Sequence, residues 1–276
     1  MLIRPITTLA ECRAVAALER VVWGYPDGED VVPPPVLMVS IKRGGILLGG
    51  FDDCGEMKGF VYSMPGLKDG RPIQWSHMLG VTPDARDGGV GLRLKLAQRE
   101  HALRMGIELI EWTFDPLQAL NAHVNFARLG VIVEEYEENI YGESPSVLHQ
   151  GTPTDRFIAE WRLTSSHVER RLFAPSSSLL RDSAVMSAVL VNSSVESAAG
   201  PAPGTPVLDS LADRLLVEIP TDFNDIVVRD ARLALDWRMT TRSIFKTYFA
   251  RGYRVVDFFL ARESGRGQYL LAPRPK

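Results

Sequence analysis

The sequence has few cysteines, no long apolar run and no cluster of basic residues. Its two cysteines, Cys12 and Cys54, have no partner at zinc-ligand spacing, so neither a disulfide framework nor a metal site is expected. No apolar run approaches the ~20 residues of a membrane-spanning helix. Residues 1–5 also lack the apolar core of a signal peptide. These absences predict a cytoplasmic protein with reduced cysteines and no membrane partner.

Net charge and chain length limit the possible partners and the number of domains. The net charge is −3 and the basic residues are scattered, so a nucleic-acid partner is not expected. A chain of 276 residues exceeds the usual size of one domain. Small and helix-breaking residues gather at 173–209, as in linkers. We therefore expect a first domain at 1–172, a linker at 173–209 and a smaller C-terminal α/β region at 210–276.

The most informative stretch is Leu79–Arg93, where an apolar run, a glycine-rich turn and the start of a helical pattern follow one another. The free N–H groups of a first helical turn converge on one point, and the helix dipole makes that point positive. Gly88, Gly89 and Gly91 have no Cβ and let a phosphate approach the backbone. Arg86 can add a charge-assisted hydrogen bond. The stretch predicts a phosphate-binding turn.

Two common phosphate-binding patterns do not fit this turn. The Walker pattern places Lys and then Ser or Thr after the last glycine, where this chain has Leu92 and Arg93. The dinucleotide pattern needs a third glycine where this chain has Leu94. The spacing Arg-x-x-Gly-x-Gly at residues 86–91 resembles the acyl-CoA diphosphate loop of the GNAT superfamily of N-acyltransferases.

A second pattern supports this resemblance. Residues 121–130, Asn-Ala-His-Val-Asn-Phe-Ala-Arg-Leu-Gly, look like the second GNAT signature, a helix that carries Asn and Ala and closes with Leu-Gly. The resemblance implies an α/β (α+β) fold. Its central sheet would be mixed, mostly antiparallel and flanked by helices, with a smaller C-terminal α/β extension.

The resemblance also implies acetyl-CoA or another acyl-CoA as co-substrate, with no metal. It places two sets of residues against that ligand. The first set is the strand end and the glycine turn: Leu79, Gly80, Val81, Arg86, Gly88, Gly89, Val90, Gly91, Leu92 and Arg93. The second set is Asn121, Asn125 and Phe126. For the two asparagines, helix capping or a surface position is the alternative.

His77 is the leading candidate for the general base. The pattern His-x-Leu-x-Val before the turn resembles GNAT members in which strand histidines relay the proton of the amine. An imidazole pKa near neutrality suits this task. The alternative is a buried histidine satisfied by a neighbour. Glu134 or Glu135, acting through a water molecule, is the second candidate for the base.

The general acid is where this chain departs from its relatives. Many GNAT enzymes have a tyrosine four residues before the last glycine of the second signature, where this chain has Phe126. Phenylalanine has no proton to give, although it can pack beside the pantetheine arm. Tyr136 and Tyr141 lie nearby in sequence and are candidate substitutes. The alternative for both is an amphipathic side chain at the end of a strand.

Local patterns predict the remaining elements. Thr8 and Glu11 form a capping box before a helix at Leu9–Trp23. Further helices are predicted at 36–43, 92–105, 116–129 and 230–251. Strands are predicted at 1–6, 45–52, 58–64, 73–81, 107–114, 156–163, 214–219, 253–260 and 268–271. The C-terminal region has no phosphate loop, so we expect it to serve packing, dimer contacts or a pocket wall.

Together these patterns predict an N-acyltransferase. It would move an acetyl or other short acyl group from acyl-CoA to the amine of a small molecule by direct attack. Succinyl-CoA with an amino acid acceptor is a variant of this interpretation. A non-catalytic acyl-CoA sensor and a protein lysine acetyltransferase are the alternatives, and association into a homodimer stays open.

Overall fold

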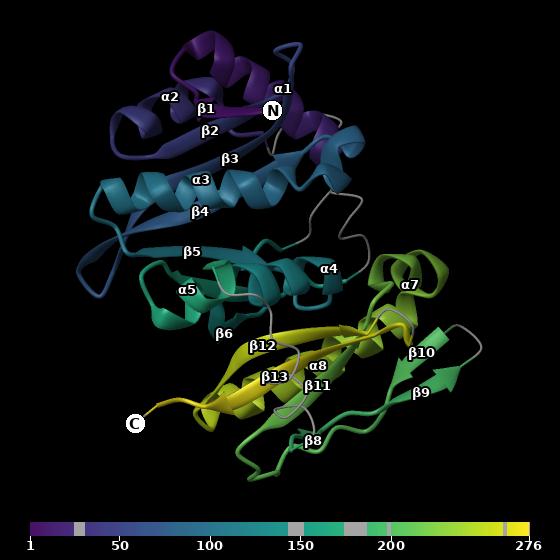
Figure 1. Ribbon diagram of the computed structural model, residues 1–276. Coiled ribbons are helices and arrows are strands. Elements are labelled where there is room, and N and C mark those ends of the chain that lie inside the picture. The colour runs from purple at the N-terminus through teal and green to yellow at the C-terminus, as the bar shows by residue number, and fades with distance from the viewer. Residues whose placement is uncertain (25–30, 143–151, 174–186, 198–199, 262–263, 276) are drawn as a thin grey trace. The chain divides into compact units, whose positions relative to one another are not determined.

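The computed structural model describes residues 1–276 except 25–30, 143–151, 174–186, 198–199, 262–263 and 276 (Figure 1). The described residues form two compact units, one made by Met1–Trp112 and one that begins at Thr113. This division falls inside strand β5 (Leu109–Phe114). The predicted linker at 173–209 therefore lies within the second unit, and its residues 174–186 are outside the described residues. Separate domains at the predicted boundaries remain a prediction.

The first unit begins with a helix whose ends the sequence specifies. The chain up to β5 contains, in order, β1 (Leu2–Pro5), α1 (Leu9–Trp23), α2 (Pro34–Lys42), β2 (Ile46–Phe51), β3 (Met57–Lys68), β4 (Arg71–Val81), the 3₁₀ helix η1 (Pro83–Gly88) and α3 (Val90–Arg104). The predicted capping box is confirmed: the Glu11 N–H donates to Thr8 Oγ1, and the Glu11 carboxylate accepts the Thr8 N–H. Gly24 ends α1 in the left-handed conformation.

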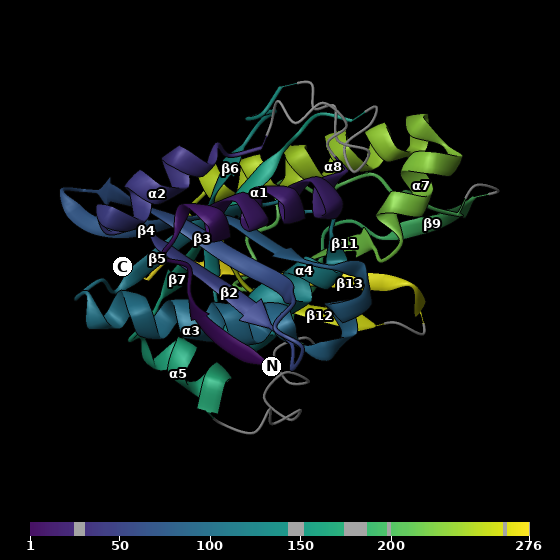
Figure 2. The same ribbon diagram turned by 90° about the horizontal axis from the view of Figure 1, so that it is seen from above.

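The sheet of the first unit has the order β1-β2-β3-β4-β5. Its strands pair antiparallel except for β4 and β5, which pair parallel. Figure 2 shows α1 and α2 on one face of β2, β3 and β4, and α3 on the opposite face. A buried core forms between α1, α2 and the sheet, with Cys12, Leu37, Phe60 and Tyr62 among its members.

The second unit contains the remaining elements. They are α4 (Ala119–Ala122), the π-helix η2 (His123–Leu129), β6 (Ile132–Glu137), β7 (Arg156–Arg162), α5 (Ser166–Phe173), β8 (Val189–Leu190), β9 (Ser194–Ser197), β10 (Gly200–Pro203), β11 (Leu215–Pro220), α7 (Phe223–Arg229), α8 (Ala231–Ala250), β12 (Tyr253–Ala261) and β13 (Arg266–Pro273). Its strands follow the order β7-β6-β12-β13-β11-β8, and β9 pairs with β10 separately.

The C-terminal residues complete the core of this unit. β12 pairs with β6 through Val255 and Val133, so strands from both sides of residues 173–209 share one sheet. α8 begins at Asp230, whose carboxylate accepts two N–H groups of its first turn, and it packs on β6, β11 and β12. Phe157, Phe245 and Tyr269 form a buried aromatic group with ring centroids 4.6 to 5.5 Å apart. The C-terminal region thus has the packing role that its lack of a phosphate loop suggested.

Most predicted elements are confirmed, and the mixed, mostly antiparallel sheet flanked by helices is as expected. The sequence patterns missed α5, α7, β6, β9 and β10, and they did not distinguish the π-helical turns of η2 from an α-helix. Within the described part of the chain, every helix is too short or too polar to span a lipid bilayer.

Candidate functional site

Strand β4 carries a β-bulge at His77. Tyr62 of β3 faces Met78, and the next residue, Ser63, faces Ser76, so His77 is an extra residue with no cross-strand partner. A bulge of this kind redirects side chains and locally bends the strand. Met78 and Tyr62 both pack in the core under α1 and α2. The bulge places the His77 ring against Tyr62, with ring centroids 6.2 Å apart in an edge-on arrangement.

His77 is an exposed residue, but its ring packs edge-on against the buried Tyr62 ring and is partly surrounded by protein. This partial burial lowers the pKa of His77 from its usual value, because the charged imidazolium loses contact with water. The ring is therefore mostly neutral at pH 7 and able to accept a proton. The role of His77 as the general base stays a prediction.

Strands β4 and β5 separate soon after they pair. Their parallel register joins Gln74 to Ile110 and Trp75 to Glu111, whereas β4 continues to Val81. We call the place where this pairing ends, after Trp75 and Glu111, the fork. The second half of β4, up to Val81, is therefore not paired with β5.

Backbone N–H groups in the second half of β4 point away from β3. The Thr82 N–H donates to the Lys58 carbonyl of the β3 side at 2.9 Å. Because backbone groups alternate in direction along a strand, the N–H groups of Leu79 and Val81 point away from β3. Two donors at this spacing suit a ligand that lies extended along the strand.

The start of α3 presents free backbone donors. Gly89 is the N-cap, with φ 67° and ψ 16°, and no side chain of the described residues caps the helix. The first intrahelical bond runs from Arg93 N–H to the Gly89 carbonyl at 3.1 Å. The N–H groups of Val90, Gly91 and Leu92 therefore have no acceptor within the helix. Helix starts of this kind bind anions in other proteins, and anion binding at this one stays a prediction.

Glycine occurs at the positions of this turn for different structural reasons. Gly89 has φ +67°, and no heavy atom lies within 4 Å of where its Cβ would be, so glycine is favoured there by conformation and the space is open. A Cβ on Gly91 would lie 3.7 Å from Leu79 Cδ2, in ordinary contact. Gly88 is exposed. The turn is not filled by the side chains described around it.

Gly80 has a packing role that the sequence did not suggest. A Cβ at Gly80 would lie 2.9 Å from the Phe60 ring and 3.2 Å from the Trp23 ring. Glycine at this position is therefore explained by the core under α1, and a ligand contact through its backbone remains a prediction. Val90 is 2% exposed, so only its backbone is available to a ligand.

Cationic side chains flank the turn. Arg86 of η1 and Arg93 of α3 are both exposed. η1 is tied to β3, because Lys58 Nζ donates to the Asp84 carboxylate at 3.0 Å. Leu92 is half-buried. The two arginines are free to turn toward a bound anion, which is what the predicted diphosphate site requires.

The second unit contradicts the predicted role of Tyr136. Its hydroxyl donates to Asp155 Oδ2 at 2.6 Å, and its ring packs against Phe157 and Phe245. Burial, and then the Asp155 carboxylate, raise the pKa of Tyr136 far above its usual value. A hydroxyl held by a carboxylate in this way is a poor acid, and Tyr136 is a packing residue.

Phe126 is likewise a core residue. Its side chain is fully buried against Phe114 and Tyr269, with ring centroids 6.2 and 5.8 Å away. No surface of the ring is left for a pantetheine arm, which corrects the predicted contact. Asn125 is also buried, and its carbonyl accepts N–H groups from Gly130 and Val131 at the end of η2.

The other predicted residues of the second unit lie at the surface. Asn121 is exposed on α4. Tyr141 is 48% exposed, and its hydroxyl lies 2.8 Å from Thr113 Oγ1 near the end of β5. Glu134, a candidate for the base, pairs with Arg254 and Arg274, and Glu135 is exposed. Of these, Tyr141 keeps an accessible hydroxyl.

The sequence analysis missed Lys95. This residue of α3 is 4% exposed, and its Nζ donates to Ser76 Oγ at 3.2 Å and to Gln98 Oε1 at 2.8 Å. Nζ also lies 3.7 Å from the centre of the Trp112 ring. The available signal was a lysine within the apolar face of a helical pattern. That signal is weak, since long lysine side chains often reach solvent from such positions.

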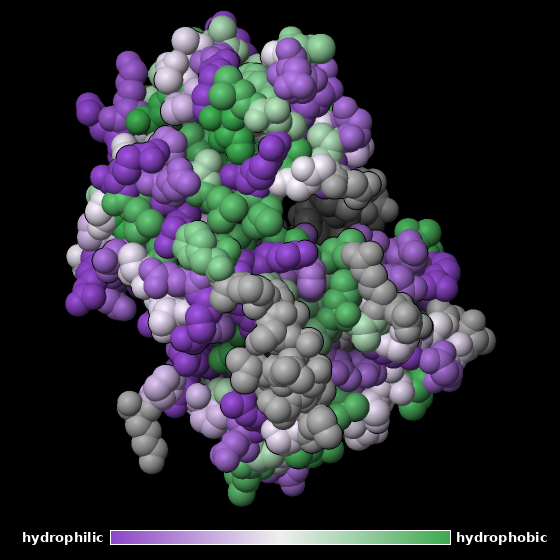
Figure 3. Space-filling view, in the orientation of Figure 1, coloured by the Kyte–Doolittle hydropathy of each residue, from purple (hydrophilic) through white to green (hydrophobic). Residues whose placement is uncertain are grey.

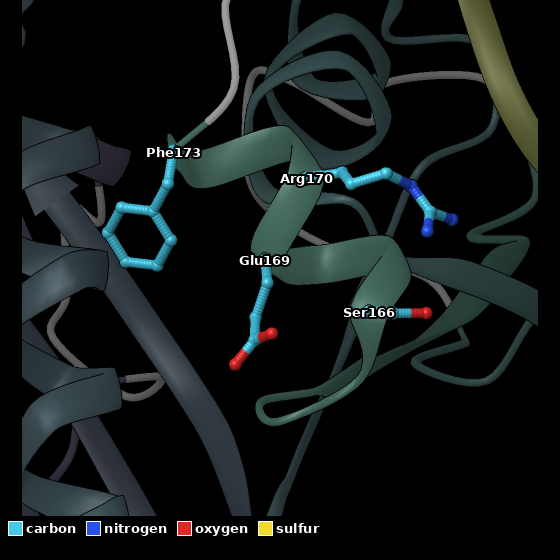
Figure 4. Close-up of a pocket in the computed structure, with 4 residues that line it drawn as sticks. All are labelled: Ser166, Glu169, Arg170 and Phe173. Atoms are coloured by element: carbon cyan, nitrogen blue, oxygen red, sulfur yellow. The ribbon is translucent and has the colours of Figure 1, made fainter.

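The second unit also has a surface hollow of about 540 Å³ along α5. Ser166, Glu169, Arg170 and Phe173 line it, all from this one helix (Figure 4). In Figure 4 the side chains of Ser166 and Arg170 point one way and those of Glu169 and Phe173 another, so they do not converge on a ligand. Across the part of the chain that the structure describes, no group of three histidine, cysteine or acidic side chains is arranged to hold a metal ion.

No protein-family model and no curated protein matches the sequence. Among solved structures, the chain is similar to aminoglycoside 6'-acetyltransferase type Ii, with a TM-score of 0.47 and 16% identity over 60% of this chain and 99% of that one. It is similar to a GNAT-family acetyltransferase from Streptococcus pneumoniae, with a TM-score of 0.46 and 17% identity over 58% and 96% of the two chains. It is also similar to a ribosomal-protein-alanine N-acetyltransferase from Brucella melitensis, with a TM-score of 0.45 and 18% identity over 58% and 98%.

Proposed function

We propose that this protein is an N-acyltransferase that moves an acetyl or other short acyl group from acyl-CoA to the amine of a small molecule. The observation that carries the proposal is the uncapped start of α3, where Gly89 opens the turn and the N–H groups of Val90, Gly91 and Leu92 are left for an anion. A diphosphate is the anion that fits a helix start flanked by Arg86 and Arg93.

The pantetheine arm would follow β4. From the start of α3, the N–H groups of Leu79 and Val81 offer donors along the strand toward the bulge at His77. Hydrophobic and hydrophilic residues are interspersed over the face of the first unit that carries α3 (Figure 3). Such a mixed surface suits a ligand with charged and apolar parts.

The reaction needs three events. The amine nitrogen attacks the thioester carbonyl carbon while His77 removes its proton. Backbone N–H groups stabilise the oxyanion that forms. The C–S bond then breaks, and the thiolate of CoA takes up a proton. Most of the catalysis is positioning and proton transfer, so no covalent intermediate with the protein is required.

A thiol-release assay tests the proposal. The purified protein is incubated with acetyl-CoA, succinyl-CoA and a panel of amines that includes amino acids, aminoglycosides and lysine peptides. Turnover with a small amine supports the proposal, and turnover with lysine peptides alone assigns a protein acetyltransferase. CoA binding measured by calorimetry, without turnover of any amine in the panel, would assign a non-catalytic CoA-binding protein. Phe126 would then explain the missing activity, because it is buried and has no proton to give.

A matched pair of glycine variants tests the binding turn. Gly89 and Gly70 have φ of +67° and +75°, and neither has a heavy atom within 4 Å of its Cβ position. Gly89→Val and Gly70→Val therefore carry similar backbone strain, but Gly70 lies in the β3–β4 turn and away from α3 in sequence. We expect only Gly89→Val to weaken CoA binding. Equal affinities for CoA in both variants would remove the turn from the site.

A further inference from the structure

Lys95 lies one helical turn beyond the proposed diphosphate site. Residues four apart share a face of an α-helix, so Lys95 and Gly91 face the same way. The Gly91 Cβ position contacts Leu79 and Val81 at 3.7 and 3.8 Å, and Lys95 contacts Ser76 at 3.2 Å. This face of α3 therefore follows β4 backward from the strand end toward the bulge.

The amine of Lys95 lies at the opening of the fork. Ser76 and Trp112 are the residues that follow Trp75 and Glu111, the last pair that joins β4 to β5. Nζ contacts both of them, at 3.2 Å from Ser76 Oγ and 3.7 Å from the centre of the Trp112 ring. The amine is thus placed where the two strands begin to diverge.

This position matches the reacting end of an extended acyl-CoA. A strand advances ~3.3 Å per residue, so the path from Val81 to Ser76 is about 17 Å. The pantetheine arm is of comparable length. With its diphosphate on the first turn of α3 and its arm along β4, the ligand has its thioester sulfur at the level of Ser76 and Lys95.

We propose that Lys95 is the general acid that protonates the thiolate of CoA as it leaves, a role that rests on the acyltransferase function proposed above. Phe126 has no proton to give, and Tyr136 is held by Asp155. In the step, the C–S bond of the tetrahedral intermediate breaks, and its electron pair goes to sulfur. A proton moves from the Lys95 ammonium to sulfur and gives CoA thiol and a neutral amine. Water or the proton released by the acceptor amine restores the ammonium.

Burial changes the acidity of Lys95 in the direction that this role requires. Burial lowers the pKa of Lys95 well below its usual value, which makes its ammonium a stronger acid than an exposed lysine. Burial is the cause of this shift, with no charged neighbour contributing to it. The ionisable residues on the strands that contact Nζ are His77 on β4 and Glu111 on β5; β3, which also packs on α3, carries Lys58, Tyr62 and Lys68, and Arg99 lies one turn further along α3. Glu111 is itself engaged by Lys68 at 2.5 Å. The His77 pKa is also lowered, so the two groups titrate below their usual values in the same direction.

Lys95→Met is the primary test. It keeps the apolar length of the side chain and removes the proton donor, while Gln98 Nε2 still donates to Ser76 Oγ at 3.1 Å. We expect kcat with acetyl-CoA and an acceptor from the panel to fall about 10²- to 10⁴-fold, as for loss of a general acid. We expect no fall in the temperature of thermal unfolding, because the variant no longer buries an ionisable group. The decline of the rate toward alkaline pH, as the pH rises through the lowered Lys95 pKa, should disappear.

The leaving group provides a second readout that packing alone does not affect. The acetyl thioester of 4-nitrothiophenol releases a far more acidic thiol, which leaves without protonation. The rate loss of Lys95→Met should therefore shrink with this donor. Gln98→Leu removes a neighbour of Lys95 but keeps the amine, so it should retain both the alkaline decline and the donor dependence of the unaltered protein.

The possible results separate the two proposals. If the unaltered protein binds CoA but turns over no amine, the proposed function fails and Lys95 has no acid role. If the unaltered protein is active and Lys95→Met keeps its rate or its alkaline decline, only the Lys95 proposal fails. A rate loss of equal size with both thioesters, accompanied by lower stability, also overturns it in favour of packing. If Tyr141→Phe lowers the rate with acetyl-CoA but not with the 4-nitrothiophenol thioester, the general acid is Tyr141 instead of Lys95.

Discussion

The two units treat buried charge differently. In the second unit, Arg238 donates two hydrogen bonds of 2.6 Å to the Asp115 carboxylate, and Arg242 donates two of 2.8 and 2.7 Å to Asp155. In the first unit, Glu19 accepts one N–H, from Val32, and its Oε1 has no hydrogen-bond partner in the part of the chain that the structure describes. Two buried carboxylates of the second unit are thus paired with arginines, whereas the Glu19 carboxylate of the first unit is incompletely hydrogen-bonded. Groups with displaced pKa values occur in both units, since burial also lowers the pKa of His167 in the second.

This difference indicates where proton chemistry is found. Buried groups whose pKa values are displaced toward neutrality are typical of functional sites. Lys95 and Glu19 of the first unit are displaced in this direction, and burial is the first cause of each pKa shift. Burial also lowers the pKa of His77 in the first unit and of His167 in the second. Burial of Asp115 acts to raise its pKa, but the charge and hydrogen bonds of Arg238, the charge of Arg156 and the Leu117 N–H together keep that pKa below its usual value. We therefore expect variants in the second unit to change stability and variants in the first to change rates and pH dependence.

The largest stability effect is expected from Asp115→Asn. Removing one partner of a buried ion pair leaves Arg238 uncompensated and costs about 3–5 kcal/mol. In the unaltered protein this contribution is present above the unfolded pKa of aspartate and is lost as the pH falls through the lowered folded pKa. Urea denaturation at pH 7 measures the loss. The matched control is Asp222→Asn, which breaks an exposed pair with Arg229 of 2.9 Å and should cost at most about 1 kcal/mol. Equal losses in the two variants would contradict the contrast.

A change in rate without a change in stability is expected from His77→Gln. Loss of a general base lowers the rate about 10²- to 10⁴-fold. The acid side of the kcat/KM profile, where the unaltered protein loses activity as pH falls through the lowered His77 pKa, should flatten. A profile that keeps this limb in His77→Gln would exclude His77 as the base.

Glu19→Gln tests the cost of an incompletely partnered carboxylate. Burial raises the pKa of Glu19 from 4.5 to about 7, so its ionised form is disfavoured in the folded state. Below the unfolded pKa both states are protonated, and the penalty grows as the pH rises to about 7, reaching about 3 kcal/mol at ~1.4 kcal/mol per pKa unit. The stability of the variant relative to the unaltered protein should therefore increase by about this amount between pH 5 and pH 8.

Glu11→Gln is the opposite-sign control for Glu19. The N–H groups of Thr7 and Thr8 and the guanidinium of Arg4 lower the pKa of Glu11 to about 2. Its stabilising contribution is present above the unfolded pKa and is lost as the pH falls toward 2. Relative stability should therefore fall with rising pH in Glu11→Gln and rise in Glu19→Gln. Parallel pH trends would show that the environments of the two carboxylates are misassigned.

The smallest effect is expected from Lys58→Met. Lys58 ties η1 to β3 through Asp84, which fixes the turn that precedes Gly89. Because the pair is exposed, we expect unchanged folding and only a small increase in the Kd for CoA. Calorimetry at two salt concentrations measures it. If Lys58→Met weakened CoA binding as much as Gly89→Val does, the position of η1 would matter to CoA binding beyond the strength of this ion pair.

The sequence predicts the features that depend on neighbours along the chain. The capping box at Thr8 and the helix start after the glycine turn each lie within one helical turn, and the structure has both. The hairpin of β2 and β3 is likewise local. The phosphate-binding turn could be found because its elements follow one another within residues 79–93.

Features that depend on distant residues could not be predicted. The bulge at His77 is a matter of register between two strands, and one sequence shows no register. Tyr136 looked available until Asp155, nineteen positions away, proved to hold its hydroxyl. Phe126 is covered by Tyr269 from the C-terminal strands. Lys95 could not be recognised because its burial comes from β4 and β5 rather than from α3.

The most direct test follows the backbone amides of α3 while CoA is added. In amide-resolved NMR of the full chain, we expect the signals of Gly89, Val90, Gly91 and Leu92 to shift with saturating behaviour, and that of Gly70 to stay in place. A protein that binds CoA while these four amides keep their positions would contradict the account.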